Sequence, residues 1–382
     1  MNKYEVNKQM LIALGGNPDD CANEFEVKKA ILNLLGGDST NCSDIYEVDL
    51  EILKIYEEGG GGSTGGGGGK VKVKSIKFNN NCVDEDGKIY TDNIDTSLVT
   101  SMYNMFYNCG SLTELDLSDL SVGNVTDMSY VFSNCKMLQS VGDLSNWNVG
   151  NVTNMRSMFN GCNSLQSVGD LSNWDVSKVT DMYNIFNGCN SLQSVGDLSN
   201  WNVGNVTNML QTFIYCYSLQ NLNLSNWNVS KVTTMQQMFR SCYSLQNLNL
   251  SNWDTSSLTN LKQMFYETSI DNLDITGWTD VSNVTSADNF YATYNSQSAI
   301  KTFVGGRSVD DVINNNIKIL NGLKVDISIR TSKTDRASIR ALINGVADLS
   351  GTTTKYINLG DLSSKLTDED IAIATAKNWT IS

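Results

Sequence analysis

The side chains best placed to do chemistry in this chain are its cysteines, because six of them recur at a fixed spacing. The 382-residue sequence contains no histidine, which removes the usual general base and the imidazole metal ligand. The recurring cysteines are Cys109, Cys135, Cys162, Cys189, Cys216 and Cys242. A metal site requires three or four ligands that converge on one point, whereas a residue repeated once per unit forms a row. We therefore expect a row of buried structural thiols.

Tryptophans form a second row with the same spacing, and two interpretations of it stay open. Its members are Trp147, Trp174, Trp201, Trp227, Trp253 and Trp278. If these rings are exposed, they can stack on the faces of sugar rings. If they are buried, each ring is a corner residue that packs one repeat on the next.

Composition argues against an enzyme and against polyanionic partners. The net charge of −14 disfavours direct binding to nucleic acid or to an anionic membrane. The acidic run at residues 84–87 lacks the ligand spacing and the distal glutamate of a calcium loop, so a turn is expected there. No apolar run approaches eighteen residues, and we expect no membrane insertion. We predict a non-enzymatic protein with no catalytic residue, no metal site and no cofactor.

Residues 99–295 consist of repeats of 26 or 27 residues, with a degenerate eighth unit at the end. The seven clear units begin at Val99, Val125, Val152, Val179, Val206, Val232 and Leu258. We number them repeats 1 to 7. A period in this range predicts a solenoid in which each unit packs only against its neighbours.

Two patterns occur within each unit, as the fifth shows. Val206, Met209 and Phe213 have the spacing of one face of a short helix. Residues 219–224 follow with leucines in the L-x-x-L-x-L spacing that is typical of a leucine-rich-repeat strand. The predicted fold class is therefore an α/β repeat, a leucine-rich-repeat solenoid with a helix and a strand in every unit.

The segments that flank the repeats differ in pattern. Residues 70–98 predict a strand-rich N-terminal cap, and residues 296–382 predict a C-terminal α/β cap, which the open end of a solenoid requires. In the latter we expect strands at 323–329 and 356–359, a helix at 336–346, and a last helix that Thr367 and Asp370 cap and that ends near Lys377.

Residues 1–58 carry three short units, 21 residues apart, each with a helix-capping signal and one apolar face. Helices this short are marginal alone, so the segment is either a small three-helix domain or a docking and assembly module. We favour the module, with a homo-oligomer, preferably a trimer, as its assembly. A flexible Gly-rich linker, residues 59–69, follows it. The predicted docking side chains are Val6, Met10, Leu14, Val27, Ile31, Leu35, Val48, Ile52 and Tyr56.

Positions that vary from repeat to repeat are the candidates for receptor contact, because the framework does not dictate them. In repeats 4 to 7 these positions gather tyrosine, isoleucine and arginine, and Tyr and Arg are enriched in interface hot spots. Ordinary surface variation would also account for them. The candidate contact residues are Tyr183, Ile214, Tyr215, Tyr217, Arg240, Tyr243 and Tyr266.

Phrases such as VTDMSYVFSNCKMLQSV and LSNWNVGNVTNMRSMF resemble the BspA-like leucine-rich repeat of many bacterial and protist surface proteins. The resemblance covers about half of the chain and holds over seven units. It implies a curved solenoid with a parallel strand ladder on one face, a role in adhesion or recognition, and no catalytic residues.

The N-terminal units, such as LGGNPDDCANEFEVKKAILNLLGG, resemble N-terminal modules of virion appendage proteins in crAss-like and related phages of Bacteroidetes. The final segment, LTDEDIAIATAKNWTIS, resembles the closing segment of repeat proteins in gut Bacteroides and their phages. The chain begins without a convincing export signal, which departs from the bacterial surface family.

These resemblances imply a virion protein that is assembled in the host cytoplasm, a head or tail fibre or a capsid decoration. Its N-terminus would bind other virion proteins, and its solenoid would bind a host-surface glycan or protein. The alternative is a bacterial cell-surface adhesin exported by an unrecognised route.

Overall fold

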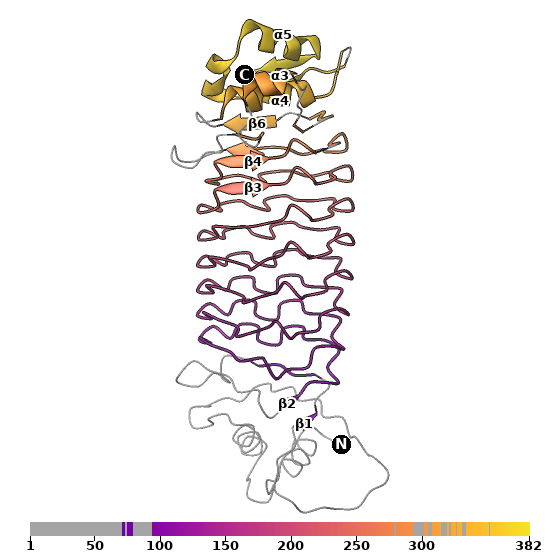
Figure 1. Cartoon of the computed structure of the whole chain (residues 1–382), viewed down its shortest axis with the longest axis vertical. Helices are drawn as coiled ribbons and strands as arrows, with labels where there is room; N and C mark the ends of the chain where they lie inside the picture. Colours follow the sequence, from indigo (N-terminus) through magenta and orange to yellow (C-terminus); the bar gives the residue numbers. More distant parts are fainter. Residues whose placement is uncertain are drawn as a thin grey trace, which may run out of the picture.

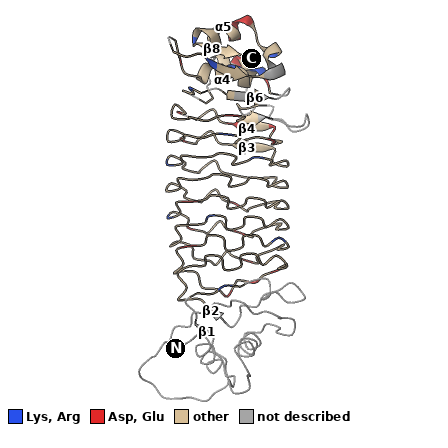
Figure 2. Cartoon of the chain, turned by 180° about the vertical axis from the view of Figure 1, so that it is seen from behind, with Lys and Arg blue, Asp and Glu red and all other residues tan. Residues whose placement is uncertain are grey.

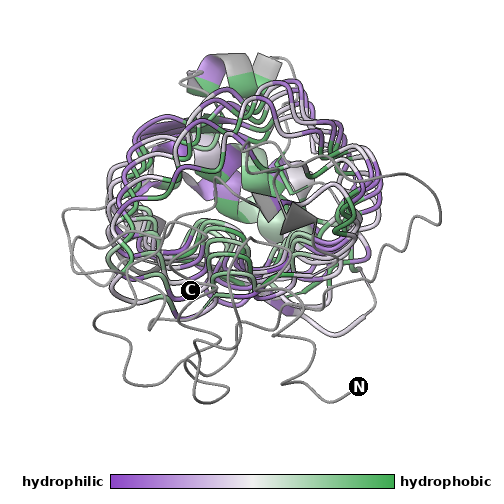
Figure 3. Ribbon diagram, turned by 90° about the horizontal axis from the view of Figure 1, so that it is seen from below, coloured by the Kyte–Doolittle hydropathy of each residue, from purple (hydrophilic) through white to green (hydrophobic). Residues whose placement is uncertain are grey.

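The computed structural model describes residues 71–72, 75–78, 94–278, 280–292, 302–304, 308–314, 319–320, 322–325, 327–330, 334–350 and 352–382. These residues form an elongated stack of turns, with the helices gathered at the C-terminal end (Figure 1). Viewed along the stack, the repeats superimpose on one closed outline (Figure 3). The predicted helical module and linker, with all nine docking side chains, and the acidic run 84–87 lie outside the described residues.

Successive repeats are joined side by side in parallel, in the register that the sequence predicts. A threonine near the start of each repeat donates its backbone N–H to the threonine carbonyl one repeat earlier, as Thr180 does to Thr153 over 2.9 Å. Single parallel bridges lie next to these bonds, and they connect Ser101–Asp127, Asp127–Asn154, Asn154–Asp181, Asp181–Asn208, Asn208–Thr234, Thr234–Asn260 and Asn260–Ser286. The structure is thus a repeat fold.

The helix predicted in each repeat is wrong, because residues 94–278 contain no helix. Two consecutive four-residue turns take its place. In repeat 1 the N–H of Met105 donates to the Met102 carbonyl, and that of Cys109 donates to the Phe106 carbonyl. The third residue of each turn, Asn104 or Asn108, has a left-handed φ of 59° or 61°, as in a type II turn.

The reason for this error is that a double turn with a four-residue period buries nearly the same positions as a helix with a 3.6-residue period. Met102, Met105, Phe106 and Cys109 are all buried, at the spacing i, i+3, i+4 and i+7. In a helix, the backbone donors would be satisfied internally. Here alternate donors cross to the next repeat, for example from Phe106 to the Val131 carbonyl over 2.8 Å.

The leucine strands of the repeats are shorter than predicted. β3 (Asn247–Asn249) and β4 (Asn272–Asp274) pair in parallel in the expected place. In earlier repeats the same place holds only isolated bridges, as between Ser167 and Ser194. The 27-residue repeats carry a left-handed glycine there, such as Gly169 with a φ of 74°. In the predicted N-terminal cap, β1 (Val71–Lys72) and β2 (Ile94–Asp95) pair in parallel.

The core of the stack is a column of phenylalanine rings, one from each repeat. Neighbouring rings from Phe78 to Phe265 lie 5.0–5.9 Å apart and within 14° of parallel. At the C-terminal end Phe290 meets Phe265 edge-on, at 88°. Because every ring contacts only the repeats before and after it, the core is continuous along the stack and has no centre.

The C-terminal segment continues the stack as a four-stranded parallel sheet. β5 (Tyr291–Ala292), β6 (Ile327–Arg330), β7 (Lys355–Asn358) and β8 (Trp379–Ile381) pair in that order. Three helices, α3 (Val309–Asn314), α4 (Arg336–Gly345) and α5 (Asp368–Ala376), and the 3-10 helix η3 (Gly360–Lys365) accompany the strands. The predictions of α4, β7 and α5 are confirmed, including the Thr367–Asp370 capping box. The strand predicted at 323–329 is confirmed only in its last part, because β6 begins at Ile327 and residues 323–325 are not in a strand. α3 and β8 were not predicted.

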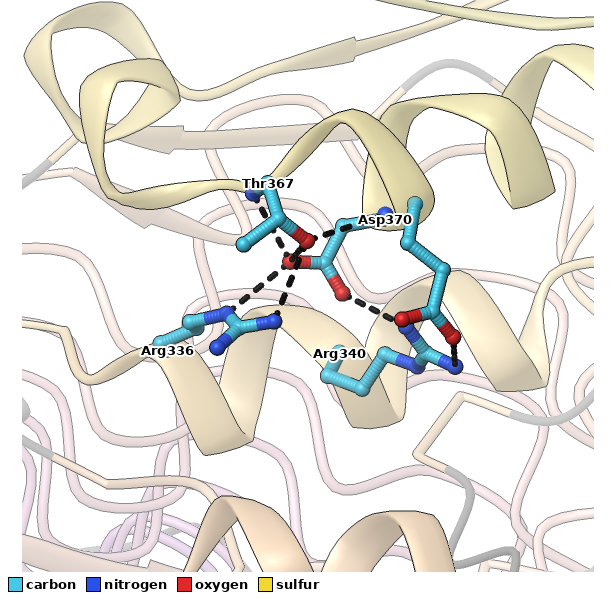
Figure 4. A network of polar contacts seen from close by, with 5 residues as sticks. Arg336, Arg340, Thr367 and Asp370 are labelled. Atoms are coloured by element: carbon cyan, nitrogen blue, oxygen red, sulfur yellow. Dashed lines mark hydrogen bonds and ion pairs between the residues drawn. The ribbon is translucent and has the colours of Figure 1, made fainter.

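A buried ion network fastens α5 to α4 (Figure 4). The fully buried carboxylate of Asp370 accepts from Arg336 Nε over 2.9 Å and from Arg340 Nη1 over 2.7 Å. Burial alone would raise the pKa of Asp370, but the hydrogen bonds from both arginines and from Thr367 outweigh it and lower the pKa to about 2. Lys, Arg, Asp and Glu are sparse along the rest of the stack (Figure 2).

Candidate binding surface on the repeats

The six repeat cysteines are buried structural thiols, as predicted. Each thiol from Cys135 to Cys242 donates to the phenylalanine carbonyl of the preceding repeat, as Cys189 Sγ does to Phe159 over 3.1 Å. Burial raises the pKa of these thiols, that of Cys242 to about 12. The thiols therefore stay protonated, in which state they are poor nucleophiles and metal ligands. Thr268, at the same place in repeat 7, is also buried.

The tryptophan row is buried as well, which decides between its two interpretations. All six rings are at most 3% exposed. Each indole Nε1–H donates to a leucine carbonyl of the preceding repeat over 3.0–3.2 Å, as Trp201 does to Leu171. Rings of adjacent repeats stack at 6.1–6.4 Å where a contact is present. The row packs the repeats and offers no ring face to a sugar.

Carboxylates that line the repeats hold turns. Asp143, Asp170 and Asp197 are one repeat apart, and each accepts the backbone N–H of the serine two residues later over 2.9 Å. These backbone hydrogen bonds lower the pKa of all three aspartates. Such turns are a common use of aspartate. Across the described ranges, no group of three or more Cys, Asp or Glu side chains is placed to hold a metal ion.

Five of the seven candidate contact residues do come together on repeats 5 to 7. Tyr217 stacks on Tyr243 at 5.1 Å and meets Tyr215 edge-on at 6.1 Å. The guanidinium of Arg240 lies 5.8 Å from the ring centre of Tyr215 and 4.9 Å from that of Tyr266. These distances fit cation–π contact. We call these five residues the tyrosine patch.

The other two candidates lie elsewhere. Ile214 is 1% exposed, so its selection as a surface contact was wrong. Arg240 and Tyr266 hold the same position in repeats 6 and 7 and are half-buried there, so the double turn alone does not bury this position. Tyr183 belongs to a separate row, where the Arg156 guanidinium covers its ring at 4.3 Å and Arg156 Nε donates to the Tyr130 hydroxyl over 3.1 Å.

Polar side chains that the sequence did not single out lie next to the tyrosine patch and orient Arg240. Gln211, Gln237 and Gln263 form an amide ladder with bonds of 2.6 and 2.7 Å. Arg240 donates to the end of that ladder at Gln263 Oε1 over 3.2 Å. The Ser241 hydroxyl donates to Glu267 over 2.9 Å. A glutamine recurring at one position in three successive repeats is the sequence signal that would have revealed the ladder.

The arrangement can bind but shows no grouping suited to bond-making chemistry. Burial, together with the neighbouring Tyr243 and Tyr215, raises the pKa of Tyr217, so its hydroxyl is neutral at physiological pH. Aromatic rings, a guanidinium and amides arranged on a fixed surface are typical of recognition sites. In the described part of the chain, no helix has the length and apolar character needed to cross a bilayer.

Together the parallel register and the ring columns define a repeat protein, and its repeats 5 to 7 carry the tyrosine patch. Residues 74–196 and 189–303 match the family described as "Mycoplasma protein of unknown function, DUF285". Because these matches together cover more than half of the chain, the protein belongs to that family. No curated protein matches the chain.

Three solved structures are similar to the chain. A leucine-rich repeat protein from Bacteroides ovatus is 13% identical, with 89% of this chain and 76% of that chain covered and a TM-score of 0.29. A leucine rich cell surface protein from Faecalibacterium prausnitzii is 13% identical, with 82% of each chain covered and a TM-score of 0.18. The functional domain of InlJ from Listeria monocytogenes, which includes a cysteine ladder, is 14% identical, with 75% and 74% covered and a TM-score of 0.16.

Proposed function

We propose that this protein is a non-enzymatic recognition protein whose repeat stack is displayed on a surface and adheres to a host-surface glycan or protein. The observation that carries the proposal is the tyrosine patch, in which the glutamine ladder orients Arg240 and the rings and the guanidinium pack on one another. A patch ordered before binding loses little conformational freedom when it binds. The repeat cysteines, the tryptophan row, Asp143, Asp170 and Asp197 have structural roles, which also favours a scaffold over an enzyme.

The surface that displays the stack is, in this proposal, a phage particle. The support is the order of segments in the sequence: an acidic module at 1–58 that resembles virion appendage modules, a Gly-rich linker at 59–69, and then the repeats. The module would dock on capsid or tail proteins, and the linker would let the stack swivel. Several copies on one particle would turn weak contacts into firm attachment through avidity.

The test of the docking role is deletion of residues 1–58 in the phage that encodes the chain. Loss of the protein from purified particles, measured by mass spectrometry, is the expected result, and a deletion of the linker alone should leave it incorporated. If the truncated protein is still incorporated at the normal level, residues 1–58 are not the anchor.

A bacterial adhesin is the competing assignment, because the repeats resemble those of bacterial surface proteins. Protease treatment of intact producing cells in the absence of phage separates the two. Release of repeat peptides from those cells would contradict the virion assignment, whereas recovery of the chain only in purified particles supports it.

A further inference from the structure

The second left-handed position of the double turn changes character at the tyrosine patch. In repeats 1 to 4 it holds asparagine or glycine, the residues that adopt this conformation most readily. In repeats 5 to 7 it holds Tyr215, Ser241 and Glu267, with φ values of 60°, 61° and 58°. Each such side chain costs about 1 kcal/mol in this conformation. Strain of this kind persists where the side chain serves a function.

One ring face in the patch is left open by the stacking order. Tyr217 covers one face of Tyr243, with the two rings 5.1 Å apart and within 16° of parallel. The equivalent position of repeat 7, on the other side of Tyr243, is Ser269, which is too small to cover a ring. Tyr243 is accordingly 44% exposed.

Polar groups that can bind hydroxyls lie beside this stacked pair. Arg240 and Ser241 precede Tyr243 by three and two residues, and Glu267, which accepts from Ser241 over 2.9 Å, precedes Ser269 by two residues. Glu267 is oriented by Ser241, and Arg240 by Gln263. An open aromatic face next to a fixed carboxylate and a fixed guanidinium combines an apolar contact with hydrogen-bond donors and acceptors.

We infer that this site binds a neutral carbohydrate, with the C–H face of a pyranose ring on the open face of Tyr243 and its hydroxyls bonded to Glu267 and Arg240. This inference rests on the proposed adhesive function and names the ligand class. The slightly positive C–H groups of a sugar match the negative face of an aromatic ring. The aliphatic Ile214 is buried, and the anchors that remain are rings and polar groups. The net charge of −14 and Glu267 disfavour acidic glycans.

The test uses the full chain and a panel of neutral hexose oligosaccharides, with uronic-acid oligosaccharides as the acidic comparison, and measures affinity by calorimetry. Tyr243→Ala should weaken neutral binding by about tenfold or more, and Tyr243→Phe should retain most of it. The matched control is Tyr103→Ala, which removes a tyrosine that is 53% exposed in repeat 1.

A second variant blocks the site without removing any part of it. Ser269→Tyr extends the stack to three rings and covers the open face of Tyr243, so it should abolish sugar binding with the Tm unchanged or raised. Equal affinity of the wild type, Tyr243→Ala and Ser269→Tyr for neutral sugars would overturn the inference, as would preferential binding of the acidic panel.

Adhesion of the same variants to intact host cells separates this inference from the proposed function. If the wild type adheres but no neutral sugar binds, the carbohydrate assignment is wrong and the adhesive function stands. Adhesion that is lost in Tyr243→Ala and also after protease treatment of the cells would indicate a protein receptor at the same patch. If the wild type does not adhere, the proposed function itself fails.

Discussion

At the scale of single residues, the inward side chains of each repeat bind backward to the repeat before it. The thiol of Cys189 reaches the Phe159 carbonyl, and the indole of Trp201 reaches the Leu171 carbonyl. Each such bond satisfies a buried polar group that would otherwise cost about 1–3 kcal/mol. Cysteine and tryptophan recur because each fills space and supplies a donor. Sequence spacing alone showed the rows but could not show whether the tryptophans face inward.

Burial of the repeat thiols predicts that they resist alkylation in the folded protein. The reactive species is the thiolate, and burial holds the pKa of Cys162 and Cys189 well above the usual value. At pH 8, iodoacetamide should leave both unmodified by peptide mass spectrometry, and 6 M guanidinium chloride should make them fully reactive. Modification of either thiol in the native protein at the rate of a free cysteine would contradict this packing.

The left-handed turn positions predict a graded response to alanine. A Cβ on Gly123 would make an ordinary contact with Asn148 Nδ2 at 3.7 Å, and one on Gly188 would lie 3.6 Å from Gly161 Cα, but Gly188 has a φ of 72°. Gly161 combines a φ of 74° with a Cβ that would lie 2.7 Å from Asn134 Oδ1. In denaturant unfolding, Gly123→Ala should be near neutral, Gly188→Ala should cost about 1 kcal/mol, and Gly161→Ala should cost more. Equal effects at all three positions would show that the left-handed conformation is not required.

At the scale of elements, the sequence correctly predicted the helices that short-range signals in the chain specify. The Thr367–Asp370 box marked the start of α5, and the apolar spacing marked α4. The helix in the repeats was wrong because burial at i, i+3, i+4 and i+7 fits both a helix and a double turn. The tyrosine patch was largely predicted because its members lie at equivalent positions of adjacent repeats. The burial of Ile214 was missed because the same position is half-buried in repeats 6 and 7, where it holds Arg240 and Tyr266. The glutamine ladder was missed although glutamine recurs at one position in repeats 5 to 7.

The ion network of α5 predicts a local loss of stability in acid. The pKa of Asp370 in the folded chain, about 2, lies below its ordinary value of 3.8. Its contribution is therefore complete above about pH 4 and is lost as the pH falls towards 2. We expect the Asp370 carboxylate to contribute about 2 kcal/mol to the stability of this region. This value allows for solvent screening of Arg336, which is partly exposed. Hydrogen exchange of residues 366–382, corrected for intrinsic rates, should show protection falling between pH 4 and pH 2.

Two variants check this assignment. Asp370→Asn should lower the protection of α5 already at pH 6, because it removes the buried carboxylate partner of Arg340 and leaves this arginine with the exposed Glu369, 3.2 Å away. Asp368→Asn removes an exposed carboxylate from the same first turn and should behave like the wild type. Protection of α5 that is constant from pH 5 to pH 2 in the wild type would show that Asp370 does not stabilise this helix.

At the scale of the whole molecule, the stack is held together by contacts between neighbouring repeats. Phe186 shows this, because its ring lies 5.6 Å from Phe159 and 5.4 Å from Phe213 and is 1% exposed. In such a one-dimensional structure, stability is close to a sum of repeat and interface terms. The loss of stability caused by a core substitution should therefore be greatest in its own repeat and should decrease with distance along the stack. In a single closed core the loss would be shared by the whole domain.

Phe186→Ala should remove about 3–5 kcal/mol of packing free energy, and the loss should be felt most in repeats 3 to 5. Native-state hydrogen exchange should rise sharply at backbone amides that cross these interfaces, such as Phe159, which donates to the Ile185 carbonyl, and Gly188, which donates to the Ile214 carbonyl. The rise should be smaller at each repeat further away. Phe186→Leu keeps most of the side-chain volume and should give a weaker version of the same profile. A uniform rise from repeat 1 to α5 would mean that the chain unfolds as one cooperative unit. A gradient would instead mean that opening stays close to the substituted repeat. A lesion in the first repeats would then leave the tyrosine patch on repeats 5 to 7 in its arrangement.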